Sequence, residues 1–261
     1  MGMRSGLRGL WRLARVLGWV LRGLAIVLWR FPRLDEAGRR AEVQRWSARV
    51  LQSLGISLRV EGRLRPGAKL LVANHISWLD IVAINAVHPS RFVSKAQVRH
   101  WPLLNRLVDA ADTLYLERER RRDALRVVHQ VAEALEAGDT VAVFPEGTTS
   151  DGTTLLPFHA NLLQAAIATQ TPVQPVALRY ADRDHPVSAA AAYVGDTTLL
   201  ASVWRVACAN GLEVRVAVLP ARGTRHMDRR ALAHLVRADI AGALEMSALE
   251  HGPREEALAS P

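Results

Sequence analysis

From residue 56 onward, short apolar runs alternate with longer segments in which apolar residues recur at helical spacing. Short apolar runs bounded by turn residues are typical of buried strands, and the longer periodic segments are typical of helices. Strands are expected at Ser57–Val60, Lys69–Ala73, Arg91–Ser94, Thr113–Leu116, Thr140–Phe144, Val173–Leu178 and Glu213–Val218. Helices are expected at Leu79–Val87, Pro102–Ala111, Arg121–Glu136, Asn161–Thr169 and Asp228–Leu244. The alternation predicts an α/β fold with a mixed, mostly parallel sheet flanked by helices.

The N-terminal segment has a different pattern. Residues 1–30 contain six arginines and no acid. On a helix these arginines fall within an arc of roughly 80°, and the leucines lie largely opposite. Trp11, Trp19 and Trp29 lie nearer the arginines. This arrangement predicts an amphipathic helix in the headgroup region of a membrane, with arginines on anionic lipid and leucines among acyl chains. A second helix is expected over Asp35–Leu54, because Phe31-Pro32 interrupts the first.

Other interpretations of this segment stay open. The uncharged run Gly23–Trp29 is too short to span a bilayer, so a spanning helix would have to tilt and place its arginines at the interface. A signal peptide is disfavoured, because no cleavage site follows. An ordinary helix packed on the core, with its arginines in water, is the third alternative. We expect residues 1–54 to form a two-helix membrane-binding element, residues 55–249 the α/β domain and residues 250–261 a flexible tail.

Composition narrows the class of partner. A length of 261 residues supports one or two domains with a sizeable core. The single cysteine, Cys208, excludes an internal disulfide framework and suits a reducing compartment. The formal charge of +9 indicates a polyanionic partner. Since the excess of positive charge lies on the apolar N-terminal helix, a membrane lipid surface is the favoured partner and no nucleic acid is expected. No metal is expected either, because the nine histidines are scattered and neither HExxH nor CxxC occurs.

Two polar clusters at the ends of expected strands carry the candidate chemistry. They are Asn74-His75-Ile76-Ser77-Trp78-Leu79-Asp80 and Phe144-Pro145-Glu146-Gly147-Thr148-Thr149-Ser150. By average residue frequencies, an NHxxxxD match arises by chance in about one chain in a hundred of this length, and a contiguous FPEGT in about one in ten thousand. In an α/β sheet the ends of two such strands can meet and form one site.

The first cluster suggests a His–Asp pair. His75 and Asp80 are five residues apart, so they would not share a face of one helix. We expect His75 on the turn after Lys69–Ala73 and Asp80 in the first turn of the next helix, where its carboxylate accepts the second imidazole N–H. Such a bond fixes the tautomer and stabilises the imidazolium. Ser77 lacks the GxSxG turn of a nucleophile, and Cys208 is interpreted as a small apolar filler. The hydroxyl that His75 deprotonates is therefore expected to be the substrate's; the alternative is a buried His beside a capping Asp.

In the second cluster, Pro145 ends the strand and Gly147 permits a close backbone approach or a positive φ. Backbone N–H groups in this turn are candidates for binding an oxyanion or a phosphate. Glu146 is a candidate for holding substrate hydroxyls. The alternative is an ordinary surface turn rich in Thr, Ser and Gly.

Together the clusters resemble the glycerolipid acyltransferases of the 1-acylglycerol-3-phosphate acyltransferase family, over about half of the chain. The motif blocks of that family are similar to Asn74-His75 with Asp80, to Thr113–Arg118, to Phe144–Ser150 and to Val173–Leu178. The resemblance implies transfer of a fatty acyl chain from acyl-CoA or acyl carrier protein to the free hydroxyl of a lysolipid, without a cofactor. Its typical acceptor is 1-acyl-sn-glycerol-3-phosphate, which gives phosphatidic acid. It also implies a peripheral or monotopic enzyme on the cytoplasmic face of the cell membrane.

The resemblance further implies residue roles. His75 is the general base and Asp80 orients it. The resulting alkoxide attacks the thioester carbonyl directly, and the thiol leaves without an acyl-enzyme. The residues expected to bind substrate are Asn74, Lys95, Arg118, Glu146, Gly147 and Thr148, with Arg118 on the acceptor phosphate.

The chain departs from the family pattern at four positions. They are Asp112, where Gly is usual, Thr149, where Arg is usual, and His159 and Asn161, where Lys and Gly are usual. Phosphate binding would then fall to Lys95 and the run Arg120-Arg121-Arg122. Otherwise the acceptor is a lysolipid without a phosphomonoester, such as lyso-ornithine lipid. Two other classes stay open: a non-catalytic lipid-binding protein with this fold, and a lipid hydrolase, which the missing Ser or Cys nucleophile disfavours.

Overall fold

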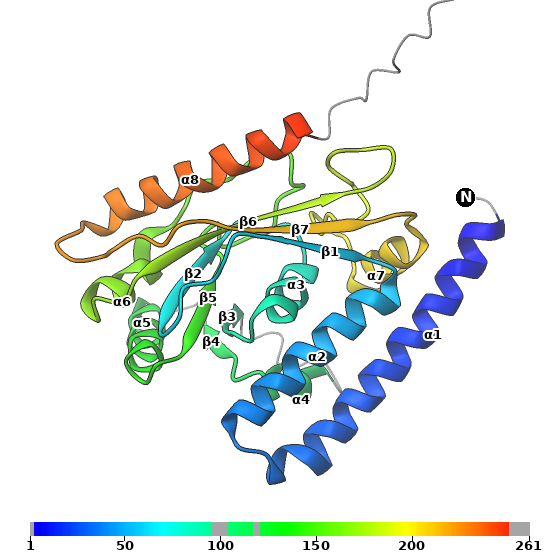
Figure 1. Ribbon diagram of the computed structural model, residues 1–261, viewed down its shortest axis with the longest axis horizontal. Helices are drawn as coiled ribbons and strands as arrows, with labels where there is room; N and C mark the ends of the chain where they lie inside the picture. The colour runs from blue at the N-terminus through cyan, green and yellow to red at the C-terminus, as the bar shows by residue number, and fades with distance from the viewer. Residues whose placement is uncertain (1–2, 96–103, 117–120, 251–261) are drawn as a thin grey trace, which may run out of the picture.

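In the described part of the chain, seven strands form one sheet, which separates two layers of helices (Figure 1). The computed structural model describes residues 3–95, 104–116 and 121–250. The strands lie in the order β1-β7-β6-β2-β5-β3-β4. Their bounds are β1 Ser57–Glu61, β2 Lys69–Ala73, β3 Arg91–Lys95, β4 Leu114–Leu116, β5 Thr140–Val143, β6 Val173–Ala181 and β7 Glu213–Val218.

Neighbouring strands pair in parallel, except that β6 and β7 are antiparallel. This sheet confirms the expected mixed, mostly parallel architecture. Helices supply the crossovers that parallel strands require. Their bounds are α1 Met3–Ala25, α2 Glu36–Leu54, α3 Leu79–Val87, α4 Leu104–Ala110, α5 Arg121–Glu136, α6 Leu163–Ala168, α7 Leu199–Cys208 and α8 Arg229–Glu250. Shorter turns follow α1, at η1 Ile26–Arg30 and η2 Phe31–Arg33, and precede α6, at η4 Ala160–Leu162.

Each face of the sheet is covered by its own group of helices (Figure 1). One core cluster joins the sheet to α2, α3 and α7, and the other joins it to α5, α6 and α8. Val50, Leu51 and Leu54 of α2 are buried in the first cluster, so α2 is part of the packed body. Every residue of β2 and β6 is buried. Strands covered on both faces read as continuous apolar runs, and the chemistry is therefore confined to their ends.

The bounds expected from the sequence pattern agree with the structure for some elements better than for others. The expected bounds of β2, β7, α3 and α5 agree with the structure, whereas β6 continues to Ala181 and α8 to Glu250. The expected helix Asn161–Thr169 begins as the short turn η4. Helix α7 was not predicted, although Thr198 caps it by accepting from the Ala201 N–H, which is a usual helix-start signal. The expected tail beyond Glu250 lies outside the described residues.

The arginines of α1 do not all face away from the protein. The Arg8 guanidinium donates to the Cys208 carbonyl at 2.7 Å, and Arg12 donates to the Ala207 and Ala209 carbonyls at 3.1 and 2.6 Å. These carbonyls end α7, where cations are favoured and acceptors lack helical partners. The expectation that the basic face lies on anionic lipid is therefore wrong for Arg8 and Arg12, which anchor α1 to α7.

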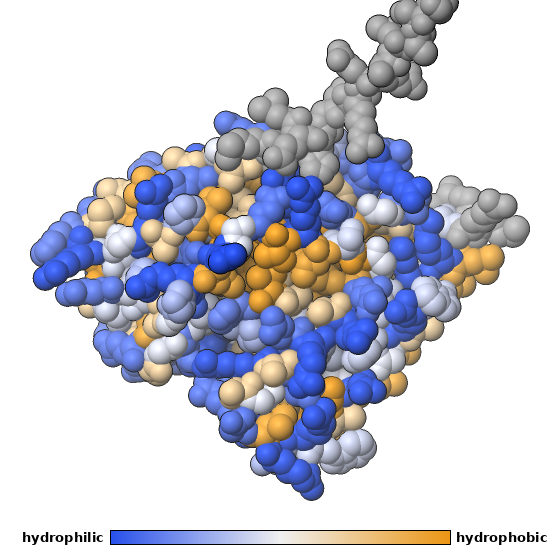
Figure 2. All heavy atoms as spheres, viewed as in Figure 1, coloured by the Kyte–Doolittle hydropathy of each residue, from blue (hydrophilic) through white to orange (hydrophobic). Residues whose placement is uncertain are grey.

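The apolar face of α1 and η1 is the exposed one. Its exposed large side chains are Leu7, Leu10, Trp11, Leu17, Leu21, Leu28 and Trp29. Arg15 lies over the Trp11 ring and Arg22 over the Trp19 ring. Hydrophobic and hydrophilic residues both lie along the margin that α1 forms in Figure 2. No helix among the described residues combines the length and the apolar character that crossing a bilayer requires.

Candidate active site

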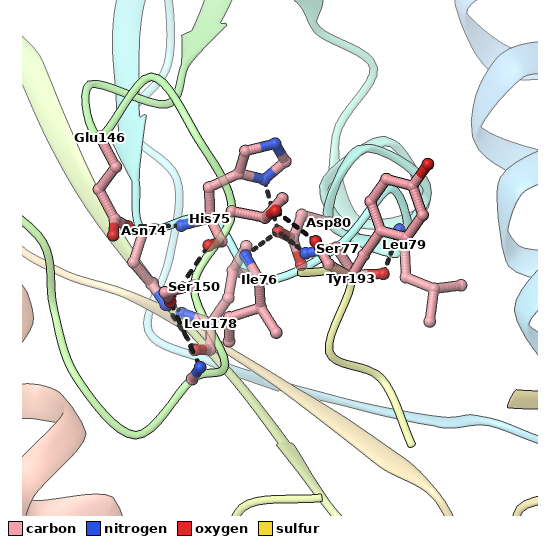
Figure 3. Close-up of polar contacts among 12 residues, drawn as sticks. Asn74, His75, Ile76, Ser77, Leu79, Asp80, Glu146, Ser150, Leu178 and Tyr193 are labelled. Carbon is pink, nitrogen blue, oxygen red and sulfur yellow. Dashed lines mark hydrogen bonds and ion pairs between the residues drawn. The ribbon is translucent and has the colours of Figure 1, made fainter. Parts of the chain in front are cut away.

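The two polar clusters meet at the carboxyl edge of the sheet (Figure 3). Strands β2 and β5 are parallel neighbours, with Val72 opposite Val143, so the turns that follow them leave the sheet side by side. The Ser150 N–H donates to the His75 carbonyl at 2.8 Å. The two clusters therefore lie side by side, as expected; that they form one functional site stays a prediction.

His75 is held from two directions. Its Nδ1 lies 2.8 Å from Oδ2 of Asp80, and the Phe144 ring stacks on the imidazole with centroids 4.0 Å apart. The His75 side chain is 19% exposed, whereas that of Asp80 is 0% exposed. In Figure 3 the second ring nitrogen, Nε2, points away from Asp80. The imidazole therefore has one nitrogen held by a carboxylate, and within the described residues the other has no hydrogen-bond partner.

Asp80 accepts hydrogen bonds at both carboxylate oxygens. Besides His75, Oδ2 accepts from the Ile76 and Ser77 N–H groups at 2.6 and 2.9 Å. Oδ1 accepts from the Tyr180 hydroxyl at 2.9 Å. A buried carboxylate needs such donors, because removing a charge from water is costly. The carboxylate is therefore pinned in one orientation facing the imidazole, as expected for an acid in the first turn of α3.

Asn74 continues the sheet at the point where β2 ends. The last β2–β6 pair is Ala73 with Val176, and the chain then turns away. The Asn74 amide takes over by donating to the Leu178 carbonyl at 2.9 Å and accepting from the Leu178 N–H at 2.7 Å. A side-chain amide offers the same donor and acceptor as a peptide group. With Asn74 only 3% exposed, its observed role is to hold the turn, and its expected contact with substrate stays a prediction.

Glu146 ties the second turn to the first. Its carboxylate accepts from the His75 N–H at 2.7 Å and from the Leu156 N–H at 3.1 Å. The residue is 4% exposed, and burial raises the pKa of its carboxyl. These contacts position the backbone of His75; a contact of Glu146 with substrate hydroxyls stays a prediction. Gly147, at φ 69°, adopts the left-handed conformation that the turn requires.

The raised pKa of Glu146 makes the stability of the fold depend on pH. The folded state holds this proton more tightly than the unfolded state, so rising pH ionises the unfolded chain first. We expect the unfolding free energy of the natural chain, relative to Glu146→Gln, to fall as pH rises past the ordinary glutamate pKa. Urea unfolding of both proteins across a pH series measures this difference. A difference that grows with pH would contradict the raised pKa.

The remaining expected site residues are placed less completely. Thr148 is exposed and lies in the turn beside Gly147. Lys95 ends β3, but its side chain lies outside the described part of the structure, as does the whole of Arg118. Within the described ranges, no three His, Cys, Asp or Glu side chains are grouped so as to hold a metal ion.

Two tyrosines that the sequence analysis did not identify also contact the site. The Tyr193 N–H donates to the Ile76 carbonyl at 3.1 Å, and its carbonyl accepts from the Thr149 hydroxyl. Its backbone is therefore bound to both turns (Figure 3). Tyr180 reaches Asp80 from 100 residues away along the chain. No local spacing signals such contacts, because they depend on the order of strands in the sheet.

Comparisons with known proteins agree with this site. A family model described as Acyltransferase matches residues 57–179, which include both turns. A lyso-ornithine lipid O-acyltransferase of Pseudomonas aeruginosa is 37% identical over 87% of this chain and 90% of that protein. A 1-acyl-sn-glycerol-3-phosphate acyltransferase of Neisseria meningitidis is 40% identical over 73% of this chain and 76% of that protein.

The fold also has a solved counterpart. The crystal structure of the 1-acyl-sn-glycerophosphate acyltransferase PlsC from Thermotoga maritima matches with a TM-score of 0.73 and 23% identity. The match covers 95% of this chain and 97% of that one. This likeness concerns the fold. On the family model and the relatives of 37% and 40% identity, the chain belongs to the lysophospholipid acyltransferase family and is an acyltransferase.

Proposed function

We propose that the protein transfers a fatty acyl chain from acyl-CoA or acyl carrier protein to the free hydroxyl of 1-acyl-sn-glycerol-3-phosphate, giving phosphatidic acid. The observation that carries the proposal is the His75–Asp80 pair, 2.8 Å apart, beside the Gly147 turn. The relative from Neisseria meningitidis bears the name of this activity.

The geometry supports general-base catalysis. Nε2 of His75 accepts the proton of the acceptor hydroxyl, while Nδ1–H stays bonded to Asp80. The alkoxide attacks the thioester carbonyl and forms a tetrahedral oxyanion, which backbone N–H donors can stabilise. The Gly147 N–H is not such a donor, because it donates to the Phe144 carbonyl at 3.1 Å. The carbon–sulfur bond then breaks, and the thiolate takes the proton from the imidazolium. Asp80 stabilises the imidazolium between the two proton transfers.

Direct transfer is supported by the surroundings of the two candidate nucleophiles. The Ser77 side chain is fully buried, and its hydroxyl oxygen accepts from the Leu79 N–H at the start of α3. Cys208 is buried where α7 meets α1, and Gly9 of α1 lies against its sulfur. Since neither group lies open beside Nε2, the substrate hydroxyl is the nucleophile in this mechanism.

Lyso-ornithine lipid is the second candidate acceptor. Thr149 stands where the family commonly has Arg, and its hydroxyl is turned to the Tyr193 carbonyl. A phosphomonoester is bound most strongly by cations, so a neutral residue here favours a different head group. The relative from Pseudomonas aeruginosa carries the name of this second activity. The transfer chemistry at His75 is the same for both acceptors.

Purified protein supplied with labelled acyl-CoA or acyl carrier protein and a panel of lysolipids separates the candidates. We expect labelled phosphatidic acid from 1-acyl-sn-glycerol-3-phosphate. Product from lyso-ornithine lipid alone would reject the first candidate in favour of the second. A panel without any diacyl product would leave the chain as a lipid-binding protein with this fold.

We also propose that α1 places the enzyme on the cytoplasmic face of the cell membrane as a peripheral or monotopic protein. The exposed leucines and tryptophans of α1 and η1 suit the boundary between headgroups and acyl chains. Arg15 and Arg22, which lie over tryptophan rings, suit anionic headgroups. Arg8 and Arg12 hold the helix against α7 and keep this face turned outward.

The substitution Leu17→Asp should weaken sedimentation with anionic liposomes at least tenfold. Leu17 is 58% exposed in the middle of the face, and burying a leucine side chain contributes about 1.5–3 kcal/mol. Leu125→Asp, at an equally exposed leucine on α5, is the matched control and should bind as the natural chain does. High salt should weaken the binding of both the natural chain and the Leu125→Asp control to anionic liposomes. Equal loss in the two variants would show that α1 has no special part in binding.

A further inference from the structure

Tyr180 bonds the one oxygen of Asp80 that His75 does not use. It is 1% exposed, and its hydroxyl donates to Oδ1 of Asp80 at 2.9 Å. We propose that Tyr180 is a positioning residue, which fixes the orientation of Asp80 and lowers the basicity of His75 by sharing the carboxylate's charge. The proposal rests on the proposed roles of His75 as base and Asp80 as its partner.

The sheet places this hydroxyl. Strand β6 continues to Ala181, past the end of β2, where Ala73 is opposite Val176. The overhanging part of β6 therefore lies under the turn that carries His75. The bridge between the Asn74 amide and both backbone groups of Leu178 fixes β6 against this turn. Side chains two apart on a strand share a face, so Tyr180 points to the same core cluster as Leu178.

To hold Asp80, the Tyr180 hydroxyl must stay protonated and so remain a hydrogen-bond donor. Burial and the neighbouring charge of Asp80 raise the pKa of the Tyr180 hydroxyl well above its ordinary value, so it stays protonated wherever the enzyme works. Among the described residues, the ionisable groups facing the His75–Asp80 pair come from two elements. Tyr180 comes from β6, and Glu146 comes from the turn after β5. Phe144, which stacks on the imidazole, is apolar. A change confined to the tyrosine therefore reports on its bond to Asp80.

Tyr180→Phe removes the donor and little else. Without it, the full charge of Asp80 faces the imidazole, and the imidazolium is more stable. We expect the acid limb of the pH profile of kcat/KM to move up by about half to one pH unit. We also expect kcat to fall about tenfold, because Oδ1 is left unpaired and the carboxylate can turn. The KM for the lysolipid should stay within about twofold, since Tyr180 does not touch substrate.

A second variant tests the role of the hydroxyl even if the Tyr180→Phe protein does not fold. Replacing Tyr180 alone with 3-fluorotyrosine keeps the hydroxyl and makes it a stronger donor. This variant should move the acid limb to lower pH, opposite to Tyr180→Phe. Thr224→Val is the matched stability control, because the Thr224 hydroxyl is buried and bonds the Ala166 and Thr171 carbonyls away from the site. It should lower the melting temperature without moving the profile.

The outcomes separate this proposal from the proposed function. An acid limb that stays in place in both tyrosine variants, or that moves in the same direction in both, overturns the role of Tyr180. If His75→Ala keeps the natural rate, His75 is not the general base, and the proposed role of Tyr180 is overturned as well. If His75→Ala is inactive but the tyrosine variants keep the natural profile, only the role of Tyr180 is overturned.

Discussion

His75→Ala should lower kcat by about 10²–10⁴-fold while the protein stays folded. Within the described residues, Nε2 of the imidazole has no hydrogen-bond partner and can take a proton from a hydroxyl, and Nδ1 is 2.8 Å from Asp80. Its backbone is held separately, by Glu146 and Ser150, so the turn keeps its shape when the ring is removed. Acyl transfer from a labelled thioester to lysolipid, with melting temperature measured alongside, checks both parts.

His129→Ala is the matched control, because His129 lies exposed on α5. It should keep the natural rate. A rate for His75→Ala within about threefold of the natural one would contradict general-base catalysis by His75, since that role is worth far more.

Asp80→Asn should lower kcat to a similar degree, about 10²–10⁴-fold, without lowering stability. The amide is nearly the same size as the carboxylate. Its oxygen can accept from the Ile76 and Ser77 N–H groups, and its NH₂ can donate to the Tyr180 hydroxyl oxygen. What disappears is the negative charge that stabilises the imidazolium. Because burying a charge is costly even when it is hydrogen-bonded, its loss should leave the melting temperature equal or higher.

The double variant His75→Ala with Asp80→Asn tests whether the acid acts through the imidazole. Residues that act as a unit have strongly non-additive effects. The double variant should therefore be about as slow as His75→Ala alone. A further drop equal to the full effect of Asp80→Asn would show that Asp80 acts on substrate directly.

Local sequence predicted the parts of the site that lie close together along the chain. The strand Lys69–Ala73, the turn at His75 and the acid in the first turn of the next helix follow from apolar patterning and helical spacing, and the structure confirms them. The fold class followed in the same way, because alternating strands and helices leave few packing solutions.

Contacts between distant segments could not be predicted in this way. Asn74 bonds Leu178, and Tyr180 bonds Asp80, across about a hundred residues of chain. Both bonds exist because β6 lies beside β2 and extends past it, which the apolar pattern of neither strand specifies. The contacts of the α1 arginines could not be predicted from local spacing either. Their spacing predicted a basic face, but only the docking of α1 on α7 assigns Arg8 and Arg12 to backbone carbonyls.

In the proposed mechanism, His75 acts as the base that activates a lysolipid hydroxyl for direct attack on an acyl thioester. The most direct measurement follows a labelled acyl thioester with and without lysolipid, for the natural protein and for His75→Ala, while counting released thiol. Thiol and diacyl lipid should form in equal amounts, only when lysolipid is present, and about 10²–10⁴-fold more slowly in His75→Ala. Free labelled fatty acid formed without lysolipid, or label held covalently on the protein, would contradict this mechanism.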